Sequence, residues 1–323
     1  MLRRMTTRWV AFWVGPIDPI RLETFRVALG LSLLVYLAAW WRHAEEWLTP
    51  MGFHLSARAF TLAPLAPLLP VWALPWLGTV LFGSVAALIV GWNTRWAVGI
   101  ALSGVTYVTL VDPLAAFTLN KLFIVSLAVL ALVPMGSYWS LDRRAPRLQS
   151  AWPLRVLQAT IILQFFTAGW CKVAHGDWLR DPYVLWTQVQ GVYRTPFAEW
   201  LLTVLPLGVW SWMQYASLTF ELLAPLLFMV KRLRPIGFTW GFGFLLMITL
   251  TMHMLVFFTL QLVCFGVLFM DDRLLHGLRM CLHQLVLQDN TRWSPMEIRT
   301  PNTTVFSERT AAAGGAERSQ RRD

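Results

Sequence analysis

The sequence predicts an all-α fold, a polytopic membrane bundle of about eight transmembrane helices. The chain has 323 residues, of which 57% are hydrophobic and only 14% are charged, about half the charged share of an ordinary soluble domain. Its 19 tryptophans and 20 phenylalanines fit a membrane protein, because aromatic side chains are enriched at both membrane interfaces. Long apolar runs alternate with short basic clusters along the chain. Together these observations exclude an ordinary soluble enzyme.

Eight apolar runs predict the spans, since a helix needs about 20 residues to cross the hydrocarbon core. The predicted spans are 23–41, 74–92, 96–111, 117–136, 154–174, 213–230, 236–251 and 255–270. The last two form one uncharged run of about 35 residues. As a single helix this run would reach about 52 Å, which exceeds the bilayer. We therefore expect a break near His253.

The basic residues predict the orientation, because cytoplasmic loops carry an excess of Arg and Lys. Placing the basic segment 1–15 in the cytoplasm and alternating through eight spans puts both chain termini and the main basic clusters on that side. The net charge of +10 is then a topology signal of a plasma (inner) membrane protein, and we expect no nucleic-acid partner. The clusters are Arg3, Arg4 and Arg8; Arg143, Arg144, Arg147 and Arg155; and Lys231, Arg232 and Arg234.

Other segments lie within or after the predicted transmembrane domain, which covers 16–272. Residues 53–73 and 197–210 are apolar but short or broken by proline, and we interpret them as interfacial or re-entrant caps on the outer face. Residues 273–288 predict an amphipathic helix along the cytoplasmic interface, and the polar tail 289–323 is expected to be disordered. The three cysteines show no paired spacing, so we expect neither a disulfide framework nor a metal site.

Lysines inside or beside the apolar runs are candidate site residues, because a charge costs about 2.5–3.5 kcal/mol in the middle of a transmembrane helix. Lys172 closes the span 154–174 and is either a snorkelling helix-end lysine or a partly buried base. Lys121 is either an anchor at a helix start or part of a site. His253 is either a turn residue or an aid to proton transfer.

The predicted topology brings these polar residues to the same side of the membrane. Lys121, Lys172, His175, Asp177 and His253 would all lie in the outer half of the bilayer. Independent snorkelling does not require a shared side, so this convergence predicts a common outer-facing pocket.

Two acidic residues inside the apolar runs are interpreted as structural, with proton handling as the alternative. Glu23 lies one turn before Arg26, and the two can pair on one helix. Glu221 lies in the span 213–230 without an obvious local partner. It requires either an interhelical partner or protonation.

Several stretches resemble a known family. The residues PIDPIRLETFRVALGLSLLVYL (16–37), the stretch from Asn120 to YWSLD (138–142), and FFTAGWCKVAHGDW (165–178) resemble proteins of the horizontally transferred transmembrane (HTTM) family. That family is related to the membrane domain of vitamin K-dependent γ-carboxylase. The resemblance covers about residues 16–272. It implies a membrane enzyme that uses a lipid-soluble cofactor.

The resemblance also implies roles for single residues. Lys172 would be the base that deprotonates a reduced quinone, and His253 would assist the proton transfer. Lys121 and Asn120 would orient an oxyanion or CO₂. The residues that would contact the cofactor are Asn120, His175, Asp177 and Trp178.

The sequence departs from the carboxylase at two positions. Cys171 stands where the carboxylase has the first lysine of its lysine pair, and Lys121 stands where it has a histidine. We therefore do not expect γ-glutamyl carboxylation itself, and the cofactor stays unidentified beyond a reduced quinone.

Two hypotheses about function remain open. One is an enzyme or modification factor acting on a lipid-soluble small molecule in the outer-facing pocket. The other is a non-catalytic membrane factor that supports maturation, export or immunity for a peptide or partner protein. Both have the lipid bilayer as their surroundings.

Overall fold

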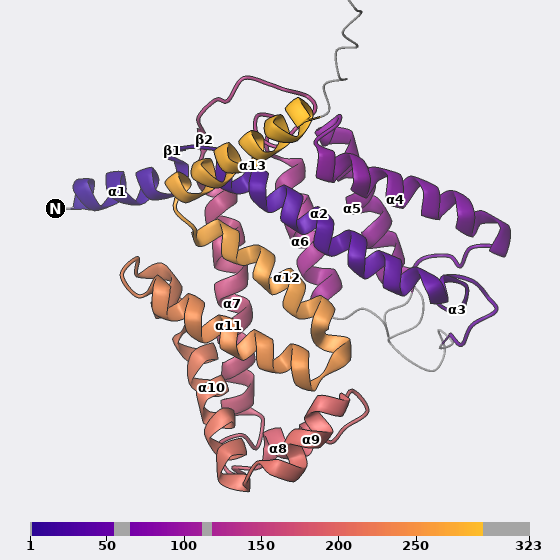
Figure 1. Cartoon of the computed structure of the whole chain (residues 1–323), viewed down its shortest axis with the longest axis vertical. Helices are drawn as coiled ribbons and strands as arrows, with labels where there is room; N and C mark the ends of the chain where they lie inside the picture. Colours follow the sequence, from indigo (N-terminus) through magenta and orange to yellow (C-terminus); the bar gives the residue numbers. More distant parts are fainter. Residues whose placement is uncertain (1, 55–64, 112–117, 293–323) are drawn as a thin grey trace, which may run out of the picture. The chain divides into compact units, whose positions relative to one another are not determined.

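The computed structural model of this chain consists mainly of α-helices (Figure 1), as the sequence predicts. It describes residues 2–54, 65–111 and 118–292. Contacts divide the chain into two compact units, Met1–Leu278 and Arg279–Asp323. The longer helices are α2 (Ile20–Trp40), α4 (Leu74–Val90), α5 (Thr94–Val111), α6 (Thr118–Ala131), α7 (Trp152–Ala174), α10 (Leu207–Met229), α11 (Arg234–Thr251), α12 (Val256–Gly266) and α13 (Asp272–Arg292).

The remaining elements of the described residues are four more helices, four 3-10 turns and two strands. The helix α1 was not expected, because the N-terminal segment was interpreted only as a basic extension. Its sequence LRRMTTRWVAFWV mixes basic residues with aromatic ones. The short elements are α1 (Leu2–Val14), α3 (Ala44–Leu48), α8 (Val184–Val189) and α9 (Pro196–Val204), the 3-10 turns η1 (Trp41–His43), η2 (Val71–Ala73), η3 (His253–Leu255) and η4 (Val267–Phe269), and the antiparallel strands β1 (Pro16–Ile17) and β2 (Gln149–Ser150).

Among the described residues, 4 helical segments are long and apolar enough to cross a membrane. They are Ile20–Leu48, Val71–Val90, Thr94–Val111 and Trp152–Ala174. Two apolar helices are shorter, Thr118–Ala131 and Val256–Phe269. The eight-span count and the cytoplasmic placement of both termini stay predictions.

The expected break near His253 is confirmed. Helix α11 ends at Thr251, Met252 is extended, and α12 begins at Val256 after the 3-10 turn η3. The interpretation of 197–210 as one cap is wrong at its end, over residues 207–210. Residues 196–204 form α9, but Pro206 precedes α10, which begins at Leu207. A proline before the first helical residue fits the start of a helix, so the chain enters a new long helix there.

Three other segment predictions meet the structure in part. Residues 55–64 of the predicted cap 53–73 lie outside the described residues. The stretch 273–288 is helical, as expected, within α13. That helix continues to Arg292, beyond the predicted boundary at 289, and residues 293–323 of the predicted tail lie outside the described residues.

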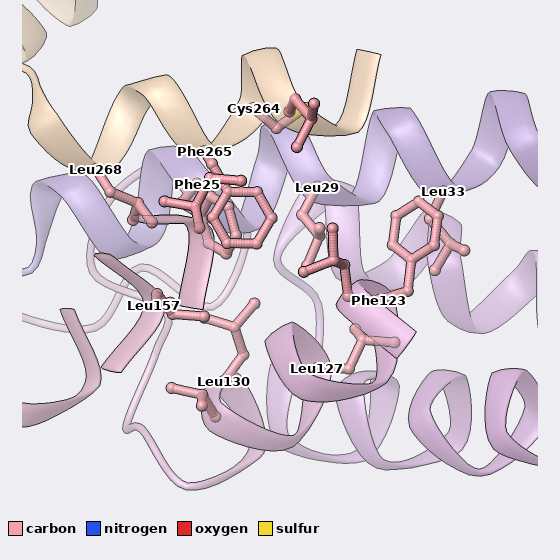
Figure 2. Packing of buried hydrophobic residues seen from close by; sticks show 14 of the residues in the cluster. Phe25, Leu29, Leu33, Phe123, Leu127, Leu130, Leu157, Cys264, Phe265 and Leu268 are labelled. Atoms are coloured by element: carbon pink, nitrogen blue, oxygen red, sulfur yellow. The ribbon is translucent and has the colours of Figure 1, made fainter. Parts of the chain in front are cut away.

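The main core forms where α2 packs against α6, α7 and α12 (Figure 2). Phe25 of α2 and Phe265 of α12 meet edge to face, with ring centroids 5.1 Å apart. Phe123 of α6 and Leu157 of α7 complete this contact region. Each of these four side chains has no exposed surface. The core therefore holds α2, near the start of the first unit, against α6 and α7 from its middle and α12 near its end.

A buried ion pair locks α2 to the loop that follows α6. The Glu23 and Arg26 side chains have no exposed surface and lie 3.3 Å apart, which confirms the expected pairing. Glu23 Oε1 accepts hydrogen bonds from the backbone N–H groups of Gly136 and Ser137 at 2.6 and 2.8 Å. Such contacts satisfy both oxygens of the buried carboxylate, as a buried charge requires.

Arg26 donates to backbone carbonyls on two sides. Its Nη1 reaches the Leu88 and Ile89 carbonyls at the end of α4, and its Nη2 reaches those of Tyr138 and Trp139, the latter at 2.7 Å. One guanidinium therefore joins α2, α4 and the loop.

The YWSLD stretch forms the other half of this lock. Ser140 Oγ donates to the Gly91 carbonyl at 2.6 Å. The Asp142 carboxylate accepts from the backbone N–H of Asn93 at 3.0 Å and from the Thr94 hydroxyl at 3.1 Å. Burial alone would raise the pKa of the Asp142 carboxyl, but these hydrogen bonds and the positive charge of Arg144 lower it below its ordinary value of 3.8. The YWSLD stretch, which carries part of the family resemblance, thus connects the loop after α6 to the turn between α4 and α5.

Candidate functional site

The candidate site is centred on an ion pair between α7 and α10. Lys172 Nζ donates to both carboxylate oxygens of Glu221, at 2.6 and 2.7 Å. The Glu221 side chain is 6% exposed and the Lys172 side chain 26%. Glu221 therefore has the interhelical partner that a buried carboxylate needs.

Gly169 explains why the two helices approach so closely at this point. A Cβ atom added to Gly169 would lie 2.9 Å from Glu221 Cβ and 3.2 Å from the Leu222 backbone nitrogen. Only glycine allows α7 and α10 to pack at this distance. Lys172 follows three residues later, nearly one turn along α7, and so faces the same side of α10.

Trp178 covers the ammonium group. Lys172 Nζ lies 4.3 Å from the centroid of the Trp178 ring, a distance at which the ring face attracts a cation. The Trp178 side chain is buried, with 6% exposed. The ammonium is therefore held between a carboxylate and an aromatic ring.

Gln214 fixes the backbone around Trp178. This fully buried side chain donates from Nε2 to the carbonyls of Trp178 and Asp181, at 2.8 and 2.7 Å. Its Oε1 accepts from the Leu185 backbone N–H at 3.0 Å. Gln214 precedes Glu221 by seven residues, so both lie on the same face of α10. One helix face thus positions both the carboxylate and the loop that carries Trp178.

A cavity of about 610 Å³ opens beside the ion pair. Its walls come from α7, α8, α10 and α11, with Trp178, Met252, Leu255 and Phe258 completing them. The volume falls within the range of small-molecule sites, which are mostly apolar with a few placed polar groups. Lys172 and Glu221 supply the charged groups of this lining, and its aromatic side chains are Phe165, Trp178, Trp210, Trp240, Phe244 and Phe258.

The loop between α8 and α9 is joined to the end of α11 beside this cavity. The Thr195 hydroxyl caps α9 by accepting from the Ala198 backbone N–H at 3.0 Å. The Thr195 backbone N–H donates to the Thr251 carbonyl, and the His253 backbone N–H donates to the Tyr193 carbonyl at 3.1 Å. A hydrophobic cluster that includes Ala198 and Trp210 joins α8, α9 and α10 beside this loop.

Asn120 and Lys121 lie elsewhere. Asn120 is 3% exposed. Its Oδ1 accepts from the Tyr36 hydroxyl at 2.8 Å, and its Nδ2 donates to the Thr109 hydroxyl at 3.2 Å. The amide therefore joins α2, α5 and α6. Lys121 is exposed, and neither residue is among the residues that line the cavity.

The described residues do not bring all five polar residues of the expected common pocket to this cavity. Of these, Lys172 alone lines the cavity, and Trp178 joins it there. His175 and Asp177 are exposed in the turn after α7, and His253 is exposed although Met252 and Leu255 on either side line the cavity. A shared membrane depth does not specify which helix face a residue occupies, and this explains the difference. The assigned chemical roles stay predictions.

Sequence reasoning missed the partner of Lys172 and the role of Gln214. The signal was present in α10, because two polar residues seven apart in an apolar helix share a face. Glu221 was recognised as needing an interhelical partner. The sequence did not specify which of the lysines met it.

The comparison with known families covers the helices that form this site. The HTTM domain matches residues 14–272. The chain belongs to the HTTM family. Neither the curated proteins nor the solved structures contain a match. The HTTM match includes both the Glu23–Arg26 lock and the Lys172–Glu221 pair, and together with the long apolar helices it identifies a membrane protein.

Proposed function

We propose that this HTTM protein binds a lipid-soluble small molecule in the cavity beside Lys172 and Glu221, and that the ion pair handles a proton of that molecule. The observation that carries the proposal is a buried ion pair in the wall of a mostly aromatic and aliphatic cavity. Ionisable groups are expensive in such surroundings, and sites that carry out proton transfer keep them there.

The geometry favours a division of roles within the pair. Glu221 is the group able to accept a proton at Oε1 or Oε2. Lys172, held as an ammonium by the carboxylate, is placed to stabilise a negative oxygen at Nζ. The lysine that the sequence analysis assigns as the base therefore acts through Glu221 in this proposal. Trp178 limits access of water to the ammonium from one side.

A reduced quinone fits the cavity residues. The flat aromatic walls suit a conjugated ring, and the adjoining aliphatic surface of Met213, Met247 and Ile248 suits an apolar tail. When bound, such a molecule supplies a weakly acidic hydroxyl group and two-electron redox chemistry. The two charged side chains would meet that hydroxyl.

The experiment fills the cavity without touching the ion pair. A Cβ atom added to Gly243, which lines the cavity, would meet no atom within 4 Å. Gly243→Leu should therefore fold normally and occupy space in the cavity. Its matched control is Gly83→Leu in α4, where an added Cβ also meets nothing within 4 Å. The measurement is binding of short-chain ubiquinol to the protein in nanodiscs, followed by its effect on thermal unfolding.

We expect ubiquinol to stabilise the wild type and Gly83→Leu but not Gly243→Leu. Lys172→Met should weaken binding by about tenfold or more, because a charge-assisted hydrogen bond contributes about 1.5–3 kcal/mol. Lys121→Met serves as its control and should bind as the wild type does. Equal binding by Gly243→Leu and the wild type would contradict the proposal.

The non-catalytic alternative has its own outcome in this design. A protein or peptide that co-purifies with the wild type and with Lys172→Met to the same extent, while ubiquinol has no effect on any variant, would favour a partner-binding factor.

A further inference from the structure

Three half-buried arginines gather at the other end of the α7 helix, independently of the proposed function. Arg21, Arg155 and Arg234 lie at or near the first residues of α2, α7 and α11. Figure 1 shows the starts of α2 and α7 close to the first turn of α13. These chain segments are far apart in sequence, so the fold itself brings the arginines together.

The segment from η4 to the start of α13 is the common point of contact. Arg21 binds Asp272 through two hydrogen bonds of 2.6 and 3.1 Å. Arg234 Nη1 donates to the Phe269 carbonyl at 3.2 Å.

Arg155 reaches the same segment through a relay. Its Nη1 donates to Gln158 Oε1 at 2.8 Å, and Gln158 Nε2 donates to the Leu268 carbonyl at 2.7 Å. Arg155 also lies over the Phe12 ring of α1, 4.3 Å from its centroid. The three guanidinium groups are thus fixed by the fold rather than free on the surface.

The arginines of this cluster are incompletely paired with carboxylates. Arg21 acts electrostatically on both Arg155 and Arg234, and Arg155 acts on Arg234. The carboxylate paired within the cluster is Asp272. Two further carboxylates have other partners: Asp271 accepts from the Arg273 backbone N–H at 3.3 Å, and Asp18 contacts His276 at 3.0 Å. Of the three arginines, Arg21 alone has a carboxylate partner among the described residues, so the like charges of Arg155 and Arg234 repel each other unless an anion binds.

Donors are available for such an anion. Within the described part of the chain, the hydrogen bonds of Arg155 and Arg234 use Nε and Nη1, which leaves the N–H groups of Nη2. The N-terminal ends of α2, α7 and α11 add backbone N–H groups and the positive ends of their dipoles.

We propose that Arg21, Arg155 and Arg234 form a binding site for a phosphate group. Guanidinium groups match the spacing of phosphate oxygens and bind them in pairs. The phosphate belongs either to an anionic phospholipid of the adjoining leaflet or to a soluble phosphate compound. An arginine that only marks topology needs no contact with another helix, whereas these three make contacts between helices.

The test uses delipidated full-length protein in detergent. Thermal unfolding is followed while phosphatidylglycerol, inorganic phosphate or diacylglycerol is added, for the wild type and for an Arg155→Gln/Arg234→Gln variant. An Arg42→Gln/Arg180→Gln variant is the matched control, because it removes the same charge from exposed positions. Arg234→Lys keeps the charge but loses the fork, and it serves if the double variant does not fold.

Phosphatidylglycerol should stabilise the wild type and the control variant, with at least about tenfold weaker binding to Arg155→Gln/Arg234→Gln. Arg234→Lys should also bind more weakly than the wild type. Stabilisation by phosphatidylglycerol alone assigns the phosphate to a lipid, and equal stabilisation by inorganic phosphate assigns it to a soluble compound. Equal binding by all variants, an equal loss in the control variant, or equal stabilisation by diacylglycerol would overturn the proposal.

Discussion

Replacing the Lys172–Glu221 pair one partner at a time, and then together, tests whether its two charges depend on each other. The variants are Lys172→Met, Glu221→Leu and the double replacement, each close in size to the original side chains. Lys172→Met leaves a carboxylate that is 6% exposed without its cation. Removing one partner of a buried ion pair costs about 3–5 kcal/mol of unfolding free energy. We expect a loss in this range.

Glu221→Leu should cost less. The Lys172 side chain is 26% exposed, so its ammonium can turn toward water, and it lies 4.3 Å from the centre of the Trp178 ring. We expect a loss of about 1–3 kcal/mol, the cost of a polar group that loses its partner. The double variant should recover much of the stability, because a buried ion pair replaced by apolar residues of similar volume is often neutral or stabilising.

The assay is reversible unfolding in mixed micelles, with the four proteins arranged as a double-mutant cycle. The expected coupling energy is about 3 kcal/mol, of the size found for neighbours in contact. A double variant whose loss equals the sum of the two single losses would refute the reasoning, because the charges would then not depend on each other. A double variant that is stable yet binds no ubiquinol would separate the functional part of the pair from its structural part.

Three further predictions concern the helix joints. Gly169→Ala should lower the unfolding free energy by about 1–3 kcal/mol, because the new Cβ would lie 2.9 Å from Glu221 Cβ, whereas Gly83→Ala, with open space at its Cβ, should be neutral or stabilising in the same unfolding assay. Arg26→Met should lower the unfolding free energy by about 3–5 kcal/mol, since Glu23 would stay buried without its cation. A loss no larger than that of an exposed arginine variant would contradict this structural role. Folding lowers the pKa of Asp142, so this carboxylate stabilises the fold above its ordinary pKa of 3.8, and the stabilisation is lost as the pH falls through the lowered pKa. Unfolding midpoints measured from about pH 6 down to about pH 3 should therefore fall more steeply for the wild type than for Asp142→Asn.

The helical architecture could be predicted from the sequence because it depends on local properties. Apolar run length predicts the long helices to within four residues at each end, except the end of α6 and the start of α10. The uncharged stretch 236–270 is too long for one helix, which indicates its break. The helix α1 was missed, because its basic residues were interpreted as a topology signal only. The start of α10 was missed, because Pro206 was taken as an interruption within a cap and not as the residue before a helix.

The site could be predicted only in part, because it depends on which helix faces meet. Lys172 and Trp178 belong to one continuous stretch, so local sequence was enough to associate them. The pairing of Lys172 with Glu221 depends on the close packing at Gly169, which a sequence shows only as one glycine among 20. The family resemblance assigns Asn120 to the same site as Lys172, but it points into a different interface, between α2, α5 and α6.

The two buried ion pairs of this protein differ in a way that separates structure from chemistry. Glu23 and Arg26 are saturated by backbone groups, with carboxylate oxygens that accept two N–H groups besides the arginine and a guanidinium that donates to several carbonyls. Neither residue of this pair lines the cavity. Within the described residues, the hydrogen bonds to Glu221 come from Lys172, and the pair borders the 610 Å³ cavity. A buried carboxylate with oxygen lone pairs left over beside a cavity is costly for stability alone. That cost is the physical reason to expect the proton chemistry at Glu221 and Lys172 and not at the more deeply buried Glu23 and Arg26.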